Sequence, residues 1–255
     1  MSSAARRIGI AALGVALGAL AGCGPAPAPP PMAMMAPAVA GHPAATTFTE
    51  LPGAPQDPDP GAETDGVVLR VAEDLAVHDA PAGEVFSTLP ATQLDNPTWV
   101  PVIDQRGDWA QVMLPSRPNG SVGWIRASGL QAARSPYVVD VDVDARRMVV
   151  RRDGAPIGEW VVGVGGPASP TPRGRTYIMA SIEETVTTFS PIILPLGTHS
   201  ETFNSYGGGP GTVALHGWPD PAVFGQDSSD GCVRVPADAM ELLTTLPLGT
   251  VVLLR

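Results

Sequence analysis

Hydrophobic and polar residues alternate in short stretches along residues 66–132, a pattern typical of β-strands with one buried face. The alternation is clearest over Trp109–Leu114, and the Asn119-Gly120 pair after it predicts a tight turn into a further strand at Val122–Ile125. More strands of this kind are predicted at 67–71, 75–78, 84–89 and 99–103. This part of the chain is therefore expected to form a small β domain.

Residues 137–255 show the same period-two pattern. Val139, Val141 and Val143 alternate with aspartates, which predicts a half-buried strand. Further strands are predicted at 146–152, 159–164, 175–180, 212–215 and 251–254. Residues 236–246 place four apolar side chains on one helical face and begin with a proline, which favours a helix. The predicted fold class is mainly β with one helix.

The N-terminus has the pattern of an export signal. Arg6 and Arg7 precede an apolar run that ends in Leu20-Ala21-Gly22-Cys23. This ending resembles the bacterial lipobox, so residues 1–22 are predicted to be a lipoprotein signal peptide and Cys23 the lipidated residue. An ordinary signal peptide or a short membrane span is the alternative interpretation. The paired arginines also permit twin-arginine export.

Residues 23–65 are rich in proline and alanine and contain few aromatic residues. A segment of this composition is expected to remain an extended spacer, because it cannot bury enough apolar surface to offset its ordering entropy. It would separate a membrane anchor from the folded part.

Charge and cysteine content narrow the function. The net charge of −10 argues against a nucleic-acid partner, which would require a basic surface. The three alternating aspartates after Tyr137 lack the spacing and glycine of a calcium loop, so no metal is predicted. Of the two cysteines, Cys232 is left unpaired if Cys23 carries lipid; a Cys23–Cys232 disulfide is the alternative in an exported protein.

Cys232 has the surroundings of a nucleophile. His216 lies sixteen positions before it and could accept the thiol proton. Gly231 suits a tight turn that would aim main-chain N–H groups at an oxyanion. Arg234 offers a forked donor for a substrate carboxylate; a salt bridge that braces the loop is the alternative.

Two stretches, His216-Gly217 and Ser229-Asp230-Gly231-Cys232-Val233-Arg234, resemble the signature of the YkuD family, the L,D-transpeptidase catalytic domain. The chain departs from the signature at Asp230, where the family usually has histidine. Ser169–Gly174 resembles a second family signature and is expected to be a structural connection beside the active-site floor. Papain-like peptidases place cysteine before histidine, the reverse of this order, and a zinc site would need more ligands.

The resemblance implies a β-sandwich that forms 3→3 peptidoglycan cross-links on tetrapeptide stems, through a thioester on Cys232 and without a cofactor. His216 would be the base, oriented by the Gly217 carbonyl, and the Gly231 N–H would be an oxyanion donor. Arg234 would bind a substrate carboxylate. Ser229 would belong to the substrate-binding site and would hold the turn by side-chain hydrogen bonding. Water as the acyl acceptor would make the protein an L,D-carboxypeptidase instead. Residues 181–210, with His199 and Tyr206, are a candidate lid.

A second resemblance covers the smaller domain. Gly107-Asp108-Trp109 followed by Gly123-Trp124-Ile125 resembles bacterial Src-homology-three (SH3) domains. It implies a small barrel that binds wall peptide or shapes the approach to the active site; core packing is the alternative role for the tryptophans. The predicted organisation is a signal peptide at 1–22, a linker at 23–65, an SH3-like domain at 66–132 and a catalytic domain at 137–255.

Together these interpretations predict a monomeric enzyme held in the cell envelope by lipid on Cys23, facing the cell wall or periplasm, with peptidoglycan stem peptides as substrates. The alternative from another class is a non-catalytic, wall-binding lipoprotein that retains the second domain as a scaffold. Asp230 in the place of histidine keeps that alternative open.

Overall fold

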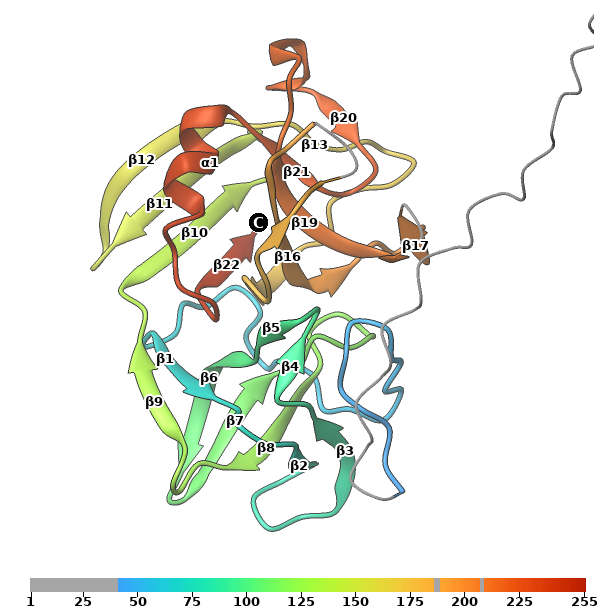
Figure 1. Cartoon of the computed structure of the whole chain (residues 1–255), viewed down its shortest axis with the longest axis vertical. Helices are drawn as coiled ribbons and strands as arrows, with labels where there is room; N and C mark the ends of the chain where they lie inside the picture. The colour runs from blue at the N-terminus through green and yellow to red at the C-terminus, as the bar shows by residue number, and fades with distance from the viewer. Residues whose placement is uncertain (1–40, 186–188, 207–208) are drawn as a thin grey trace, which may run out of the picture. The chain divides into compact units, whose positions relative to one another are not determined.

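The structure is a computed structural model that describes residues 41–185, 189–206 and 209–255 (Figure 1). The described residues belong to one compact unit and are mainly β-strand with one α-helix, α1 (Ala237–Leu243), which confirms the predicted fold class. No helix in these described ranges is long and apolar enough to cross a membrane. The predicted signal peptide, Cys23 and the first part of the predicted linker lie outside them.

The smaller β domain forms a seven-stranded sheet in the order β3-β2-β8-β7-β6-β1-β9. Its buried face carries apolar side chains such as Val77, Val112 and Ile125, all fully buried. The two end strands, β3 and β9, do not pair with each other, so the described strands do not close a barrel by hydrogen bonding, and the SH3-like interpretation stays a prediction. The strands are β1 (Val67–Arg70), β2 (Leu75–His78), β3 (Val85–Leu89), β6 (Trp99–Arg106), β7 (Trp109–Met113), β8 (Val122–Arg126) and β9 (Gln131–Arg134).

Residues 43–57, which composition placed in the linker, instead lie against this sheet, and we call them the N-terminal strap. The strap makes isolated β-bridges, Ala44 to Thr88, Glu50 to Arg117 and Gln56 to Ser121. It also buries Ala45 and Leu51 in the core of the sheet. The expectation of an extended spacer therefore does not hold for the strap, because the sheet supplies the apolar surface that the segment lacks by itself.

Residues 137–254 form a β-sandwich, in which two sheets share one hydrophobic core. One sheet has the order β12-β11-β10-β22-β14 and the other β15-β16-β19-β21. Side chains from both sheets and from α1, including Val141, Leu215 and Leu243, meet in that core. The strands are β10 (Tyr137–Asp142), β11 (Arg147–Arg152), β12 (Ala155–Val161), β14 (Gly174–Tyr177), β15 (Ile182–Glu183), β16 (Ile192–His199), β19 (Thr212–Gly217), β21 (Val233–Val235) and β22 (Val251–Leu254).

Three two-stranded ribbons complete the described strands. They pair β4 (Thr92–Gln93) with β5 (Asn96–Pro97), β13 (Val164–Gly165) with β20 (Asp227–Ser229), and β17 (Ser205–Tyr206) with β18 (Gly209–Pro210). A 3-10 helix at Pro221–Val223 precedes β20. The β13–β20 ribbon leads directly into the segment that carries Cys232.

One long strand was not predicted. β16 lies in the segment 181–210 that the sequence analysis described as a candidate lid, and it pairs with β19. Pro195 and Gly197 obscured it, since proline is uncommon inside a sheet. The pairing register of β16 shifts between Pro195 and His199, an irregularity at which a proline is tolerated.

Candidate active site

Two neighbouring parallel strands bring the predicted catalytic residues together. β19 and β21 lie side by side (Figure 1). Their register places His216 opposite Arg234. Cys232 lies just before β21, two residues from Arg234, and alternate residues of an extended chain face the same side. His216, Ser229, Cys232 and Arg234 all line one cavity of about 250 Å³, and Asp230 lines it too. Sequence reasoning therefore found residues that the fold does bring to one pocket.

His216 is a buried imidazole with a defined tautomer. Its Nδ1 lies 2.8 Å from the carbonyl oxygen of Gly217. A carbonyl can only accept, so Nδ1 carries the proton and Nε2 is left as the acceptor of the neutral ring. Burial lowers the pKa of His216; the bond to Gly217 opposes that shift, and the Arg234 charge adds to it. The ring is therefore held neutral, with Nε2 available as a base.

Cys232 is a free, largely buried thiol. Burial raises its pKa, a hydrogen bond with the backbone of Ala214 and the charge of Arg234 lower it, and the charge of Asp230 raises it. With burial dominant at both groups, a neutral thiol and a neutral imidazole line the same cavity. Such a pair needs the base to take the proton as the sulfur attacks.

The turn before Cys232 is built around Gly231, whose φ of +117° favours glycine. The Ser229 hydroxyl accepts from the Gly231 N–H at 3.2 Å and donates to the Cys232 carbonyl. Ser229 thus holds the turn, as the sequence suggested. The same contact occupies the Gly231 N–H, so that group would have to leave Ser229 before it could serve as the predicted oxyanion donor.

The guanidinium of Arg234 lies over an aromatic ring. Its guanidinium carbon is 3.7 Å from the centroid of the Trp218 ring, and its Nη1 donates to the Ser228 carbonyl. Its Nε is buried without a hydrogen-bond partner, and no ion pair involves Arg234 in the part of the chain that the structure describes. Bracing by a salt bridge is therefore not what is seen, and the guanidinium contacts Trp218 and the Ser228 carbonyl instead.

Three residues that shape the site were not predicted from the sequence to take part in it. Ser169 donates to the Asp230 carbonyl at 2.8 Å and Thr171 to the Gly231 carbonyl at 2.9 Å, so the Ser169–Gly174 stretch buttresses the cysteine turn. Its expected structural role is borne out. Tyr206, expected to pack in a lid or lie on the surface, lines the cavity and donates to the Asp230 carbonyl. His199, in contrast, is fully buried outside the cavity lining.

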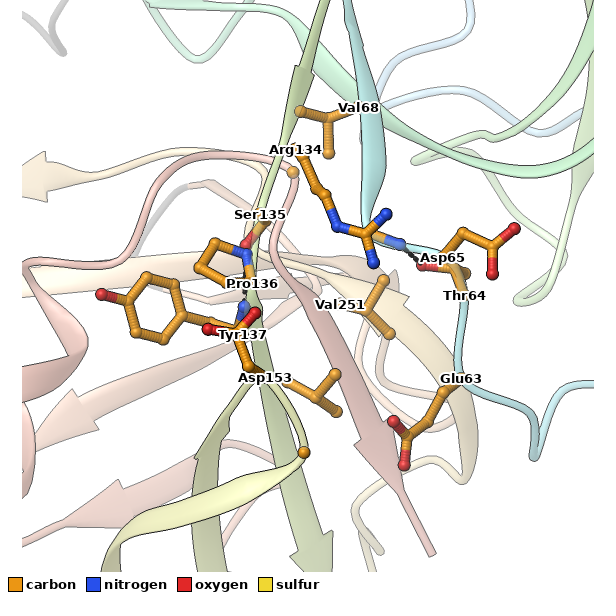
Figure 2. Close-up of a pocket in the computed structure, with 14 residues that line it drawn as sticks. Glu63, Thr64, Asp65, Val68, Arg134, Ser135, Pro136, Tyr137, Asp153 and Val251 are labelled. Carbon is orange, nitrogen blue, oxygen red and sulfur yellow. Dashed lines mark hydrogen bonds between the residues drawn. The ribbon is translucent and has the colours of Figure 1, made fainter.

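Another pocket, of about 140 Å³, contains none of these residues. Glu63, Asp65 and Asp153 line it together with Arg134 and Tyr137 (Figure 2). In the described ranges, no group of three or more histidine, cysteine, aspartate or glutamate side chains is placed to hold a metal ion. The cavity around Cys232 is thus where nucleophile, base and guanidinium meet.

Residues 136–254 match the family model of YkuD, the L,D-transpeptidase catalytic domain. This match covers slightly less than half of the chain and supports the L,D-transpeptidase family that the sequence resembles. No curated protein matches the chain.

Several solved L,D-transpeptidase structures are similar to this chain. One from Mycobacterium smegmatis has a TM-score of 0.41 and 14% identity, covering 58% of this chain and 90% of that one. L,D-transpeptidase 3 from Mycobacterium tuberculosis, in complex with a faropenem-derived adduct, has a TM-score of 0.43 and 12% identity, covering 61% and 97%. The catalytic domain of the E. faecium enzyme has a TM-score of 0.37 and 24% identity, covering 47% and 96%.

Proposed function

Since residues 136–254 match the family model of the L,D-transpeptidase catalytic domain, we propose that this protein cross-links peptidoglycan through a thioester on Cys232. The observation that carries the proposal is that a thiol and a neutral imidazole line the same cavity, with the imidazole Nδ1 held by a carbonyl. That arrangement presents Nε2 as the proton acceptor and leaves the sulfur as the nucleophile.

The first half-reaction opens the donor stem. Nε2 of His216 takes the Cys232 proton while the sulfur attacks the carbonyl carbon of the third, L-centre residue. The tetrahedral oxyanion then collapses, the bond to the terminal D-alanine nitrogen breaks, and the imidazolium returns the proton to that amine. D-Alanine leaves and the stem remains as a thioester on Cys232.

The second half-reaction uses an amine of another stem. It loses a proton to His216, attacks the thioester carbonyl and displaces the Cys232 sulfur, which recovers the proton, and a 3→3 amide results. Arg234 lines the same cavity as the thiol, and its guanidinium is suited to bind a stem carboxylate. Attack by water in place of the amine would release a tripeptide stem, the L,D-carboxypeptidase outcome.

Incubation with a carbapenem followed by intact-mass spectrometry tests the thioester. We expect one covalent adduct on the wild-type protein, none on Cys232→Ala, and greatly slowed acylation of His216→Ala with its circular dichroism unchanged. A folded wild-type protein that stays unmodified at millimolar drug would favour the wall-binding alternative. Normal acylation of His216→Ala would remove His216 from the role of base.

The reaction products show whether a stem amine or water is the acyl acceptor. Incubation with disaccharide tetrapeptides should yield cross-linked dimers and free D-alanine, both lost in Cys232→Ala. Tripeptide stems without dimers would show that water is the acceptor instead.

The lipid anchor forms a separate part of the proposal, and it places the enzyme in the cell envelope facing its stem-peptide substrates. Its support is the Leu20-Ala21-Gly22-Cys23 sequence. Fatty-acid labelling of the expressed protein should be lost in Cys23→Ala, while labelling that survives this change would show that the anchor is not on Cys23.

A further inference from the structure

Two segments that precede the catalytic domain converge on one buried residue, His199. The first is the N-terminal strap. His199 and Thr47 are each 1% exposed, and the ring Nε2 of His199 lies 2.6 Å from the Thr47 carbonyl oxygen. That carbonyl can only accept, so Nε2 carries the proton. The Thr47 hydroxyl lies 2.9 Å from the same nitrogen, so both the carbonyl and the side chain of Thr47 contact the ring.

The second segment is the turn between β7 and β8. The Asn119 amide nitrogen donates to the His199 carbonyl at 2.9 Å, and the His199 N–H donates to the Asn119 amide oxygen at 2.8 Å. One side chain thus satisfies both backbone groups of His199, as a neighbouring strand would. In the same turn, Arg117 donates to the side-chain oxygen of Asn204 at 3.0 Å.

β16 ends at His199, and the chain that follows leads to Tyr206, which lines the catalytic cavity. Opposite His199 in the sheet lies Thr212, which lines the cavity and whose hydroxyl contacts that of Thr47. We call residues 199–206 the wall segment. It ends at Tyr206, which also lines the cavity and donates to the Asp230 carbonyl. A displacement of His199 would therefore be passed along the wall segment to the turn that carries Cys232.

We propose that Asn119 and Thr47 are positioning residues of the active site. They hold the wall segment in the position from which Tyr206 contacts the Asp230–Gly231 turn. Both lie outside the segment 136–254 that matches the catalytic family. This inference rests on the proposed function. It makes the β7–β8 turn and the strap part of the catalytic apparatus, whatever else the smaller β domain binds.

The test measures carbapenem acylation of the full exported chain, with the maximal rate constant separated from the half-saturating drug concentration. Asn119→Ala removes both bonds to His199, and its maximal rate is expected to fall about tenfold with half-saturation little changed. Thr47→Val should act in the same direction and Thr47→Ser, which keeps the hydroxyl, should restore the wild-type rate. Gln105→Ala, an exposed amide on β6 of the same sheet, is the matched control.

Hydrogen exchange supplies a second measurement that does not need acylation. Amides of the wall segment should exchange faster in Asn119→Ala than in Gln105→Ala or the wild type. Wild-type rates together with wild-type exchange in folded Asn119→Ala would overturn the inference. If Asn119→Ala fails to fold, the Thr47 pair decides: equal rates for Thr47→Val and Thr47→Ser reject it. A wild-type protein that is never acylated refutes the proposed function, and exchange of the wall segment then still decides the positioning role.

Discussion

The hydroxyl of Thr171 donates a 2.9 Å hydrogen bond to the carbonyl oxygen of Gly231, the residue before Cys232. The hydroxyl oxygen of Thr171 also accepts a hydrogen bond from the Gly165 N–H, at 2.9 Å. One buried hydroxyl therefore ties the β13 strand to the turn that presents the thiol. Two sequence signatures that are sixty positions apart, around Thr171 and Cys232, are joined through this single atom.

Thr171→Val should remove both bonds while keeping the side-chain shape. The Gly231 carbonyl and the Gly165 N–H would be left unpaired in a buried place, at a cost of about 1–3 kcal/mol in the free energy of unfolding. Urea denaturation measures that loss, and carbapenem acylation should slow as the cysteine turn loosens. Thr171→Ser keeps the hydroxyl and is the control; if Val and Ser are equally stable and equally fast, the buttress is unimportant.

Two charges near the thiol act on it in opposite directions. Asp230 raises the pKa of Cys232 and Arg234 lowers it. Asp230→Asn should therefore move the pH profile of iodoacetamide alkylation to lower pH, and Arg234→Gln should move it to higher pH. Glu241→Gln, which removes an exposed carboxylate on α1 outside this cavity, should leave the profile in place. A shift of the same sign in both cavity variants would contradict this assignment of charges.

His199 makes stability depend on pH. Burial lowers its pKa from 6.5 to about 4, although the bond to Thr47 opposes that shift. Between these values the unfolded chain binds the proton and the folded chain does not, so the free energy of unfolding falls as pH drops from about 6.5 towards 4. The contribution between pH 7.5 and 4.5 is about 2–3 kcal/mol.

The measurement compares urea unfolding of wild type and His199→Gln at those two pH values. Glutamine can still donate to Thr47 but does not titrate, so the variant should lose less stability on acidification. The lowered pKa of His216 acts in the same direction in both proteins and cancels in the comparison. Identical losses in the two proteins would show that His199 does not titrate in this range.

The strap is held by a buried ion pair. Arg175 on β14 makes two hydrogen bonds to the Asp57 carboxylate, of 2.8 and 2.6 Å, and the side chains are 5% and 1% exposed. Asp57→Asn would leave a buried guanidinium without its counter-charge, which should cost about 3–5 kcal/mol of unfolding free energy. The exposed pair Arg147–Glu159 is the matched control, since Glu159→Gln should cost less than about 1 kcal/mol. Equal costs for the two changes would mean that the strap is not anchored through Arg175.

Local patterns along the chain were sufficient for most of the regular structure. The alternation at Val139 and Val141 corresponds to β10, and the apolar face around Ala239 and Leu243 corresponds to α1, which begins after Pro236. These patterns are reliable because one face of each element is buried and the other is not. His216 and Cys232 could also be recognised from the sequence, because thiol chemistry requires those two residue types.

The tertiary structure decided what depends on partners far along the chain. The strap contains few large apolar side chains, so its own composition did not predict a folded segment. Contacts with distant residues, such as that between Asp57 and Arg175, hold it against the rest of the protein. Asn119 was interpreted as a turn residue, yet its side chain pairs with the backbone of His199, eighty positions away. By itself the sequence predicted most of the strands, the helix, and the candidate nucleophile and base. Burial and hydrogen bonding between distant segments, which no local pattern encodes, determined which groups surround them.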